Sequence, residues 1–212
     1  MIRDTAVNRF CSPALEVGCG DGYLLSLLPG PVRVGVDLTF EDLVEAKNRN
    51  NAVLVRASAS RLPFRIRFPL VCAFDVVEHI DDDVEFLRSC ASVLAAEGRL
   101  VIATPSGPEL WSFFDVYAGH RRRYTKDNLR RVLEEAGLKV EVMFPLFRLL
   151  VPLAWLNARF LGKKTVTKPA SDFSVGPMAN WLLHRLLAME RIIFGRSPWG
   201  RGTSWVVVAR IG

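Results

Sequence analysis

The sequence predicts an α/β fold in which a largely parallel sheet carries helices on both faces. From Ala14 to Arg99, short apolar and β-branched runs alternate with amphipathic or turn-rich segments, the pattern produced by βαβ units. A glycine-rich turn at residues 18–22 follows the first run, as expected where a buried strand leads into a helix. With 212 residues, 50% hydrophobic and 24% charged, we expect one domain spanning residues 1–212.

The expected strands are short and rich in residues that favour an extended backbone. They lie at Ala14–Val17, Val32–Val36, Ala52–Val55, Pro69–Phe74, Arg99–Ala103, Leu138–Phe144 and Thr203–Arg210. A helix should begin near Gly22, directly after the glycine-rich turn. Two further helices have clear start signals, the acidic residues Asp81–Asp83 and the capping residue Thr125, and Gly137 is a suitable stop for the second.

The alternation of strand and helix breaks in an insert at about residues 145–202. Two apolar, arginine-containing stretches, Leu146–Leu161 and Met178–Phe194, are expected to be helices, joined by a polar linker at Gly162–Pro177. The insert offers an apolar pocket for a ligand and arginines for peripheral contact with an anionic membrane. Packing of these helices on the sheet, or against a second subunit in a homodimer, explains the same pattern.

Charge and cysteine usage limit the classes of partner and compartment. The net charge of +6 favours anionic partners or simply keeps the protein in solution. The four cysteines have no paired C-x-x-C spacing, so we expect neither a zinc site nor a disulfide framework, and a cytoplasmic location. The charged segment Arg3–Arg9 lacks the apolar core of a signal peptide, and the apolar run Leu149–Leu156 is too short to span a bilayer.

The glycine-rich turn points to a nucleoside ligand. Gly18 and Gly20 allow the backbone to approach a ligand closely at the carboxyl edge of the sheet. The next strand ends in Asp37, whose carboxylate can accept hydrogen bonds from both hydroxyls of a ribose. The spacing G-x-G-x-G differs from the dinucleotide pattern, and Asp21 would repel a pyrophosphate. A cationic sulfonium with an amino-acid tail suits this turn better.

Several separate motifs together resemble the class I S-adenosylmethionine (SAM)-dependent methyltransferases of the small-molecule type, including those of ubiquinone and menaquinone biosynthesis. They are LEVGCGDG from Leu15, VGVDLT from Val34, SRLPF from Ser60, FDVVEHIDD from Phe74 and GRLVIATP from Gly98. The resemblance implies a Rossmann-like seven-stranded sheet with an antiparallel last strand and a helical insert before it. It covers roughly residues 15–136 and returns at the last strand.

The resemblance also implies an activity. We expect methyl transfer from SAM to oxygen or nitrogen of a small, hydrophobic or lipid-linked acceptor. A non-catalytic SAM-binding or assembly subunit is an alternative from another class. A nucleic-acid methyltransferase ranks lower, and no nucleic-acid partner is expected, because no target-base motif follows the fourth strand and no recognition domain is visible.

Carried over position by position, the resemblance places the cofactor along the carboxyl edge of the sheet. Glu16 would orient the amino group of SAM, Asp37 would hold the ribose, and Leu38 would pack on the adenine. Ser58 stands where the family often has an acidic residue at the adenine amino group. The full set of expected cofactor contacts is Glu16, Gly18, Cys19, Gly20, Asp37, Leu38, Ser58, Ala59 and Asp75.

The acceptor side is expected around two histidines. His79 follows the fourth strand, and His120 lies in Gly119–Thr125, a segment similar to a G-H-x-R-x-Y-T motif of small-molecule methyltransferases. Either histidine is a candidate catalytic residue, with His120 as a base. Arg123 and Tyr124 are candidate acceptor contacts, although packing roles explain them as well.

The same loop resembles a metal-binding stretch of ubiquinone-biosynthesis O-methyltransferases. Asp75, Glu78 and His79 form the pattern D-x-x-E-H, and a divalent cation such as Mg²⁺ held there would lower the pKa of an acceptor hydroxyl. The other interpretation is that these residues hold the loop and line the cofactor pocket, and on that interpretation no metal is required.

Overall fold

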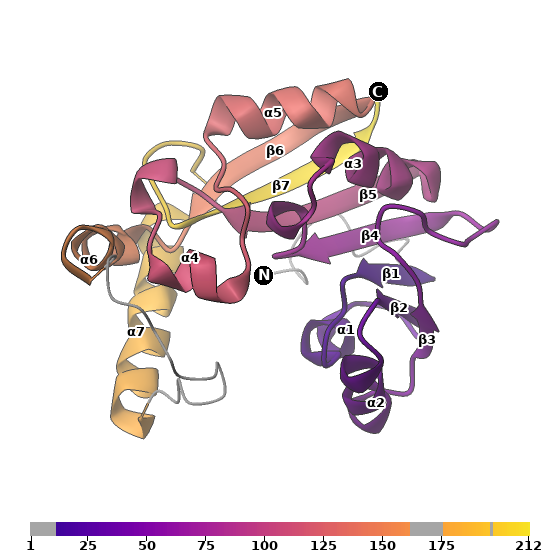
Figure 1. The fold of residues 1–212 in the computed structure, drawn as a ribbon, viewed down its shortest axis with the longest axis horizontal. Helices are drawn as coiled ribbons and strands as arrows, with labels where there is room; N and C mark the ends of the chain where they lie inside the picture. The colour runs from indigo at the N-terminus through magenta and orange to yellow at the C-terminus, as the bar shows by residue number, and fades with distance from the viewer. Residues whose placement is uncertain (1–11, 162–175, 196) are drawn as a thin grey trace.

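The structure is a computed structural model that describes residues 12–161, 176–195 and 197–212. The segment Arg3–Arg9 and most of the expected linker Gly162–Pro177 lie outside these residues. The centre of the fold is a seven-stranded sheet in the order β3-β2-β1-β4-β5-β7-β6 (Figure 1). The strands are β1 (Ala14–Val17), β2 (Arg33–Asp37), β3 (Val53–Arg56), β4 (Phe68–Phe74), β5 (Leu94–Pro105), β6 (Leu138–Leu146) and β7 (Ser204–Ile211).

Strand direction confirms the expected fold class. Strands β1 to β5 pair in parallel, whereas β7 is antiparallel to both β5 and β6. The main helices are α1 (Tyr23–Leu27), α2 (Phe40–Arg49), α3 (Asp83–Ser92), α4 (Phe113–Ala118), α5 (Lys126–Glu135), α6 (Val151–Leu156) and α7 (Pro177–Phe194). Short turns of helix lie at Val77–His79, Pro108–Leu110, Arg148–Leu150 and Asn157–Leu161.

Two apolar clusters lie on opposite faces of the sheet, because side chains alternate along each strand. On one face, Leu15 of β1 belongs to a cluster with Phe86 of α3 and Leu129 of α5. On the other face, Ala14 belongs to a cluster with Leu25 of α1 and others. Burying one such large side chain contributes about 1.5–3 kcal/mol, so both helical layers are held firmly to the sheet that carries the site.

Several boundaries differ from the expectation, most of them by one or two residues. Strand β5 begins at Leu94 rather than at Arg99, because Leu94 pairs with Phe68 beyond a register shift in β4. The expected helix Leu146–Leu161 begins two residues later, because β6 continues to Leu146. The insert leaves the sheet at Leu146 and returns beside it, since the Thr203 N–H donates to the Leu146 carbonyl at 3.0 Å.

Candidate active site

The glycine-rich turn after β1 folds against the end of β2. Gly18 and Gly20 have φ values of 72° and 47°, which favour glycine. The Gly20 N–H donates to Asp37 Oδ2 at 2.8 Å, and the Thr39 N–H donates to Oδ1 of the same carboxylate at 2.9 Å. A Cβ on Gly18 would lie 2.4 Å from Val76 Cγ2, whereas a Cβ on Gly20 would meet no atom within 4 Å. The turn therefore presents bare backbone to open space beside Asp37.

Glu16 is the buried carboxyl group beneath this turn. Its side chain is 1% exposed, and its Oε2 atom has no hydrogen-bond partner. Burial, together with repulsion from Asp21 and Asp37, raises the pKa of Glu16 to about 8. A buried acceptor without a partner is costly, so Glu16 suits a ligand that brings a cationic donor such as an ammonium group.

Asp21 makes the ligand side of the turn less negative than the sequence predicted, because its carboxylate is paired within the protein. Its carboxylate pairs with Arg49 of α2 at 2.8 Å and also accepts from the Tyr23 N–H at 3.0 Å. The pairing with Arg49 offsets the charge that was expected to repel a pyrophosphate. The acidic character of the turn therefore comes mainly from Glu16 and Asp37.

The remaining expected cofactor residues follow the carboxyl ends of the neighbouring strands β1 to β4. Leu38 is 65% exposed, as an apolar surface for a planar base would be, and Ser58 is also exposed beside half-buried Ala59. The side chain of Cys19 is buried and burial raises its pKa to about 12, so this residue can offer a ligand only its backbone. Asp75 has a positive φ of 52° at the end of β4 and an exposed side chain.

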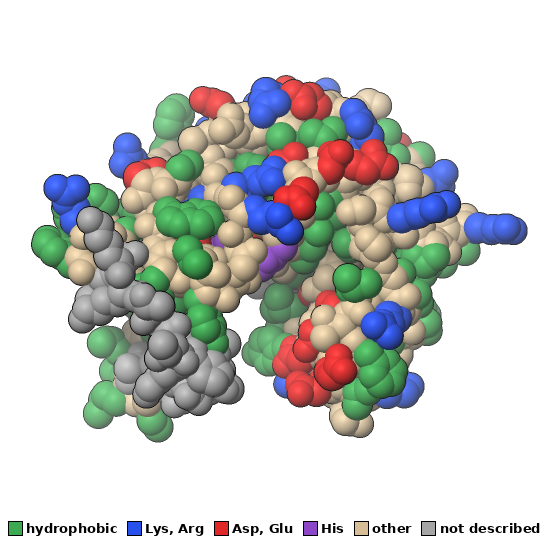
Figure 2. Space-filling model, viewed as in Figure 1, with side chains coloured by type: hydrophobic (Ala, Val, Ile, Leu, Met, Phe, Trp, Pro, Cys, Tyr) green, Lys and Arg blue, Asp and Glu red, His purple; other side chains and the backbone are tan. Residues whose placement is uncertain are grey.

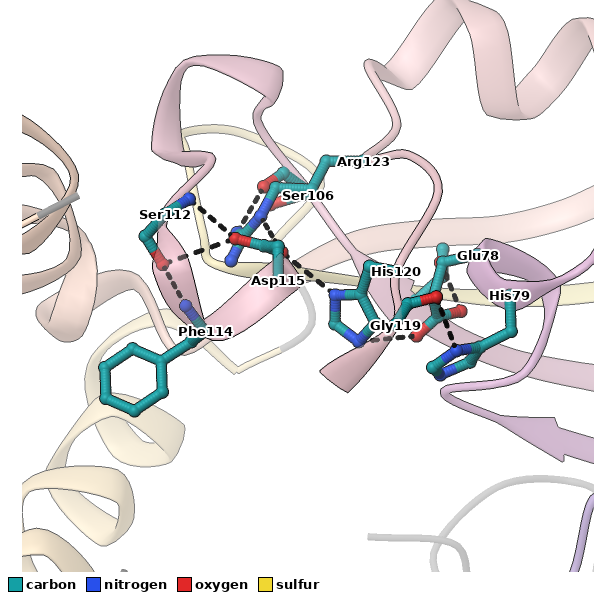
Figure 3. Close-up of polar contacts among 10 residues, drawn as sticks. Glu78, His79, Ser106, Ser112, Phe114, Asp115, Gly119, His120 and Arg123 are labelled. Atoms are coloured by element: carbon teal, nitrogen blue, oxygen red, sulfur yellow. Dashed lines mark hydrogen bonds and ion pairs between the residues drawn. The ribbon is translucent and has the colours of Figure 1, made fainter. Parts of the chain in front are cut away.

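A polar cluster is formed by residues of the loop after β4 and of the segment around α4 (Figure 3). His120 Nδ1 lies 2.9 Å from Asp115 Oδ1, and His120 Nε2 lies 4.0 Å from Glu78 Oε1. His79 packs edge-on against His120 and directs Nδ1 to the Gly119 carbonyl at 3.2 Å. Figure 2 shows histidine side chains in the hollow between α4 and the lobe that carries α1 and α2. The two expected histidines are in direct contact with each other.

Asp115 determines which nitrogen of His120 is free. Burial works to raise the pKa of Asp115, but hydrogen bonds from His120, Arg123 and the Ser112 N–H together lower it to about 2. The carboxylate is therefore ionised and can only accept, so His120 Nδ1 carries the proton and Nε2 is left as a base. An imidazole with a free Nε2 and an orienting carboxylate can act chemically as a general base.

Sequence reasoning missed Asp115. The residue lies in the first turn of α4 as the last member of a capping box, in which the Ser112 N–H donates to Asp115 Oδ2 at 2.8 Å. The S-x-x-D spacing marks such a helix start and was available in the sequence. It identifies a helix, however, and carries no information that the second carboxylate oxygen would contact His120.

Glu78 is the buried member of this polar cluster. Its side chain is fully buried, Oε2 accepts from Thr104 Oγ1 at 3.0 Å, and Oε1 has no partner. Burial is the main cause that raises the pKa of Glu78 to about 7. A protonated Glu78 is neutral and leaves His120 Nε2, 4.0 Å away, without a hydrogen bond, whereas an ionised Glu78 favours a cation at this place.

The donor atoms of Glu78, His79 and His120 lie within 4.8 Å of one another. These donor types suit a divalent metal. The expected set contained Asp75 in place of His120, and Asp75 is not a member of this group. Two ligands bound to zinc at tetrahedral angles lie about 3.4 Å apart, so the 4.0 Å between His120 Nε2 and Glu78 Oε1 would have to shorten.

Arg121 and Arg122 make their contacts with other residues of this protein. Arg121 pairs with Asp81 and donates to the His79 carbonyl at 2.7 Å, and Arg122 pairs with Asp83 at 2.9 Å. These contacts fasten the segment that carries His120 to the loop that carries His79. The arginines therefore position the histidines rather than project toward a ligand.

The placement of Tyr124 favours the packing role over a contact with the acceptor. Its side chain is 3% exposed and its hydroxyl donates to Asp83 Oδ2 at 2.9 Å. Burial is the main cause that raises its pKa. Tyr124 belongs to the main apolar cluster, because the backbone that presents His120 turns inward there to begin α5.

An apolar pocket of about 580 Å³ lies behind Arg123, between α4 and the insert. Arg123 connects the pocket to the histidines, since its Nε donates to Asp115 Oδ1 at 2.7 Å. The pocket is lined by Leu110, Ser112, Phe114, Arg123, Leu150, Leu153, Ala154, Leu156, Asn157, Phe160 and Thr203. The expected substrate residue Arg123 thus lies at the polar end of an apolar space.

A family model described as a methyltransferase domain matches residues 11–142, well over half of the chain. The chain belongs to the SAM-dependent methyltransferases. The methyl donor of this family is SAM. The matched region contains the glycine-rich turn, Asp37 and both histidines, whereas the insert lies outside it.

Curated relatives agree with this membership, and a solved structure shares the fold. This chain is 30% identical over 139 residues to a probable SAM-dependent methyltransferase of Mycobacterium tuberculosis, and the match covers 63% of this chain and 51% of that protein. It therefore spans about half the length of this relative. It is 28% identical to a ubiquinone biosynthesis O-methyltransferase of a Bradyrhizobium species, covering 65% of this chain and 70% of that protein. A SAM-dependent methyltransferase structure from Mesorhizobium loti has the same fold, with a TM-score of 0.60, 16% identity and coverage of 93% and 90%.

Replacing Glu16 by Gln in the methyltransferase domain should stabilise the ligand-free protein at pH 8 and weaken SAM binding. A carboxyl whose pKa rises from 4.5 to about 8 on folding favours folding below its unfolded pKa, and this stability is lost as the pH rises toward 8. Glu78, whose pKa is also raised, lowers the Tm of both proteins over this range, so the Gln variant should lose several degrees less between pH 5 and pH 8 than the native protein. Thermal melts at both pH values, with calorimetric SAM titrations, check both effects. An equal pH response of the two proteins would contradict the assignment.

Proposed function

We propose that this protein transfers a methyl group from SAM to oxygen or nitrogen of a small, hydrophobic or lipid-linked acceptor. The observation that carries the proposal is the position of the Asp115–His120 pair beside the glycine-rich turn. The short segment Asp75–His79 joins the two, since Val76 borders Gly18 and the charges of both histidines act on the Asp75 carboxyl, where they partly offset the rise in its pKa that burial causes. A base and a donor site are thereby combined at one edge of the sheet.

The chemistry asked of these residues is modest, because the methyl group of SAM is already activated. The acceptor atom forms a bond to the methyl carbon while the bond from that carbon to sulfur breaks, which leaves S-adenosylhomocysteine. His120 Nε2 takes the proton of an acceptor hydroxyl or amine, and ionised Asp115 stabilises the imidazolium that results. Alignment of the two reactants and exclusion of water supply the rest of the acceleration.

The pocket behind Arg123 supports an acceptor with an apolar part. Its lining is dominated by apolar side chains contributed by α6 and by the segment before α4, and such pockets bury the apolar surface of a ligand. Similarity to proteins named ubiquinone biosynthesis O-methyltransferases agrees with an acceptor of this kind. A head group held near His120, with a tail in the pocket, places the reacting atom at the donor site.

We expect methyl transfer to continue in EDTA. A bound divalent cation would be held by Glu78, His79 and His120 and would lower the pKa of an acceptor hydroxyl. A proton on Glu78, whose pKa is raised to about 7, satisfies the same cluster, and His120 already has an internal partner. Full activity after chelation is the expected result. Loss of activity in EDTA with recovery on adding Mg²⁺, Mn²⁺ or Zn²⁺ would instead assign these three residues to a metal.

The proposal is tested by incubating the purified protein with SAM carrying an isotopically labelled methyl group and with lipid and aqueous extracts of cells. A labelled product in the lipid fraction, heavier by one methyl group in mass spectrometry, is the expected result. Binding of SAM without any labelled product from either fraction would favour the alternative of a non-catalytic SAM-binding subunit. Labelled nucleic acid would contradict the choice of a small acceptor.

A further inference from the structure

The outward face of α7 is apolar over the length of the helix. Met178, Trp181, Leu182, Met189, Ile192 and Ile193 are all exposed, and they recur at spacings of three and four residues, which places them on one side of the helix. The opposite side packs on the fold, where Glu190 accepts from the Leu149 N–H at 3.1 Å. This outward face, together with exposed Trp155, Arg159 and Phe160 of the preceding segment, is called the insert surface below. Figure 2 shows apolar side chains gathered where Figure 1 places α6 and α7.

The charges on the insert surface have one sign. Arg185 lies within the outward face of α7, over the Trp181 ring at 5.3 Å, and Arg159 lies over the Trp155 ring at 6.0 Å. Among the described residues of the insert, the one acidic side chain is Glu190, and it is buried. The exposed insert surface therefore combines aromatic and aliphatic side chains with arginines alone.

We propose that the insert surface docks peripherally on an anionic lipid membrane. Apolar side chains interleaved with arginine match a lipid surface, where tryptophan occupies the interfacial layer and arginine reaches the phosphates. A second copy of the chain is a poorer partner, since twofold pairing brings the same surface onto itself and sets Arg185 and Arg159 against arginines. Among the helices of the described residues, none is long and apolar enough to cross a membrane.

The insert surface adjoins the proposed acceptor site. Phe160 belongs to the surface and also lines the pocket behind Arg123. A docked protein would therefore hold that pocket against the lipid in which a lipid-linked acceptor resides. This last step rests on the proposed function, whereas membrane docking itself does not.

Flotation of the full-length protein with vesicles tests the proposal without SAM or an acceptor, so its outcome is separate from that of the activity test. We expect the protein to float with mixed phosphatidylcholine and phosphatidylglycerol vesicles and to stay behind with phosphatidylcholine alone. Ile192→Glu, at a position 83% exposed, should lower the partition coefficient about tenfold or more. Arg185→Gln should lower it about fivefold.

Ile66→Glu is the matched control, because it makes the same exchange at an exposed position outside the insert. It should bind vesicles as the native protein does. Equal binding of Ile192→Glu and the native protein, or equal binding to both vesicle types, would overturn the proposal. So would sedimentation equilibrium that shows a dimer in the native protein and a monomer in Ile192→Glu, since a second copy would then cover the surface.

Discussion

Replacing His120 by Ala is expected to lower kcat for methyl transfer about 10²- to 10⁴-fold, with almost no change in the Kd for SAM. The imidazole contacts Asp115 and faces Glu78, and none of its contacts reaches the glycine-rich turn. Asp115→Asn should lower kcat in the same direction, because an amide cannot stabilise the imidazolium that forms when His120 takes a proton. Single-turnover rates with labelled SAM, and calorimetric SAM titrations, separate the two parameters.

His184→Ala provides the control for this prediction. His184 is an exposed histidine on α7, so its loss should leave kcat unchanged when activity is assayed with an acceptor dispersed in detergent. Thermal melts establish that all variants are folded. If His120→Ala retained native kcat in a folded protein, the proton would have to leave by another route, and His120 would be reduced to a structural role beside His79.

Replacing Gly20 by Ala is expected to weaken SAM binding about 10- to 100-fold. In the ligand-free protein the new methyl group would meet no atom within 4 Å. We place the tail of the cofactor in this open space, so the methyl group would collide with bound SAM. A side chain forced into an occupied contact costs about 1–3 kcal/mol, which corresponds to this loss in affinity. Isothermal titration with SAM measures the effect directly.

Gly137→Ala is a matched control for the backbone strain of Gly20→Ala. Both glycines have positive φ, and a Cβ on Gly137 also meets nothing within 4 Å, but Gly137 follows α5 at the opposite end of the sheet. Both variants should lose similar stability, whereas Gly137→Ala alone should retain SAM affinity. Equal affinities in the two variants would show that the cofactor does not approach Gly20.

Local patterns predicted the sheet and the cofactor turn because both depend on residues close in sequence. The run Ala14–Val17 and the glycines after it identify a buried strand and a tight turn by themselves. The start of β5 was missed, since the extension to Leu94 depends on a register shift that brings it opposite Phe68. Such pairing between distant segments leaves no periodic signal in either of them.

The acceptor side was predicted less well for the same reason. His79 and His120 were identified, yet their common orientation depends on Asp115 and on contacts from Arg121 that cross about forty residues of chain. Tyr124 was assigned to the acceptor because of its place in the motif, but burial against Asp83 is a property of the packed α3 and α5 layer. The contributions of Arg122 and Arg123 likewise became clear only with their carboxylate partners.

The contact between Thr203 and Leu146 brings the two ends of the insert together, so that the insert forms a closed loop on the sheet. The entropy of closing such a loop changes slowly with length, by about 0.6 kcal/mol for each doubling. Descendants of a common ancestor can therefore lengthen, trim or exchange this segment without disturbing the sheet or the donor turn. The proposed acceptor pocket and membrane surface can therefore change in the insert while the part of the chain that binds the methyl donor stays the same. Replacing the segment between Leu146 and Thr203 by that of a relative would test this independence.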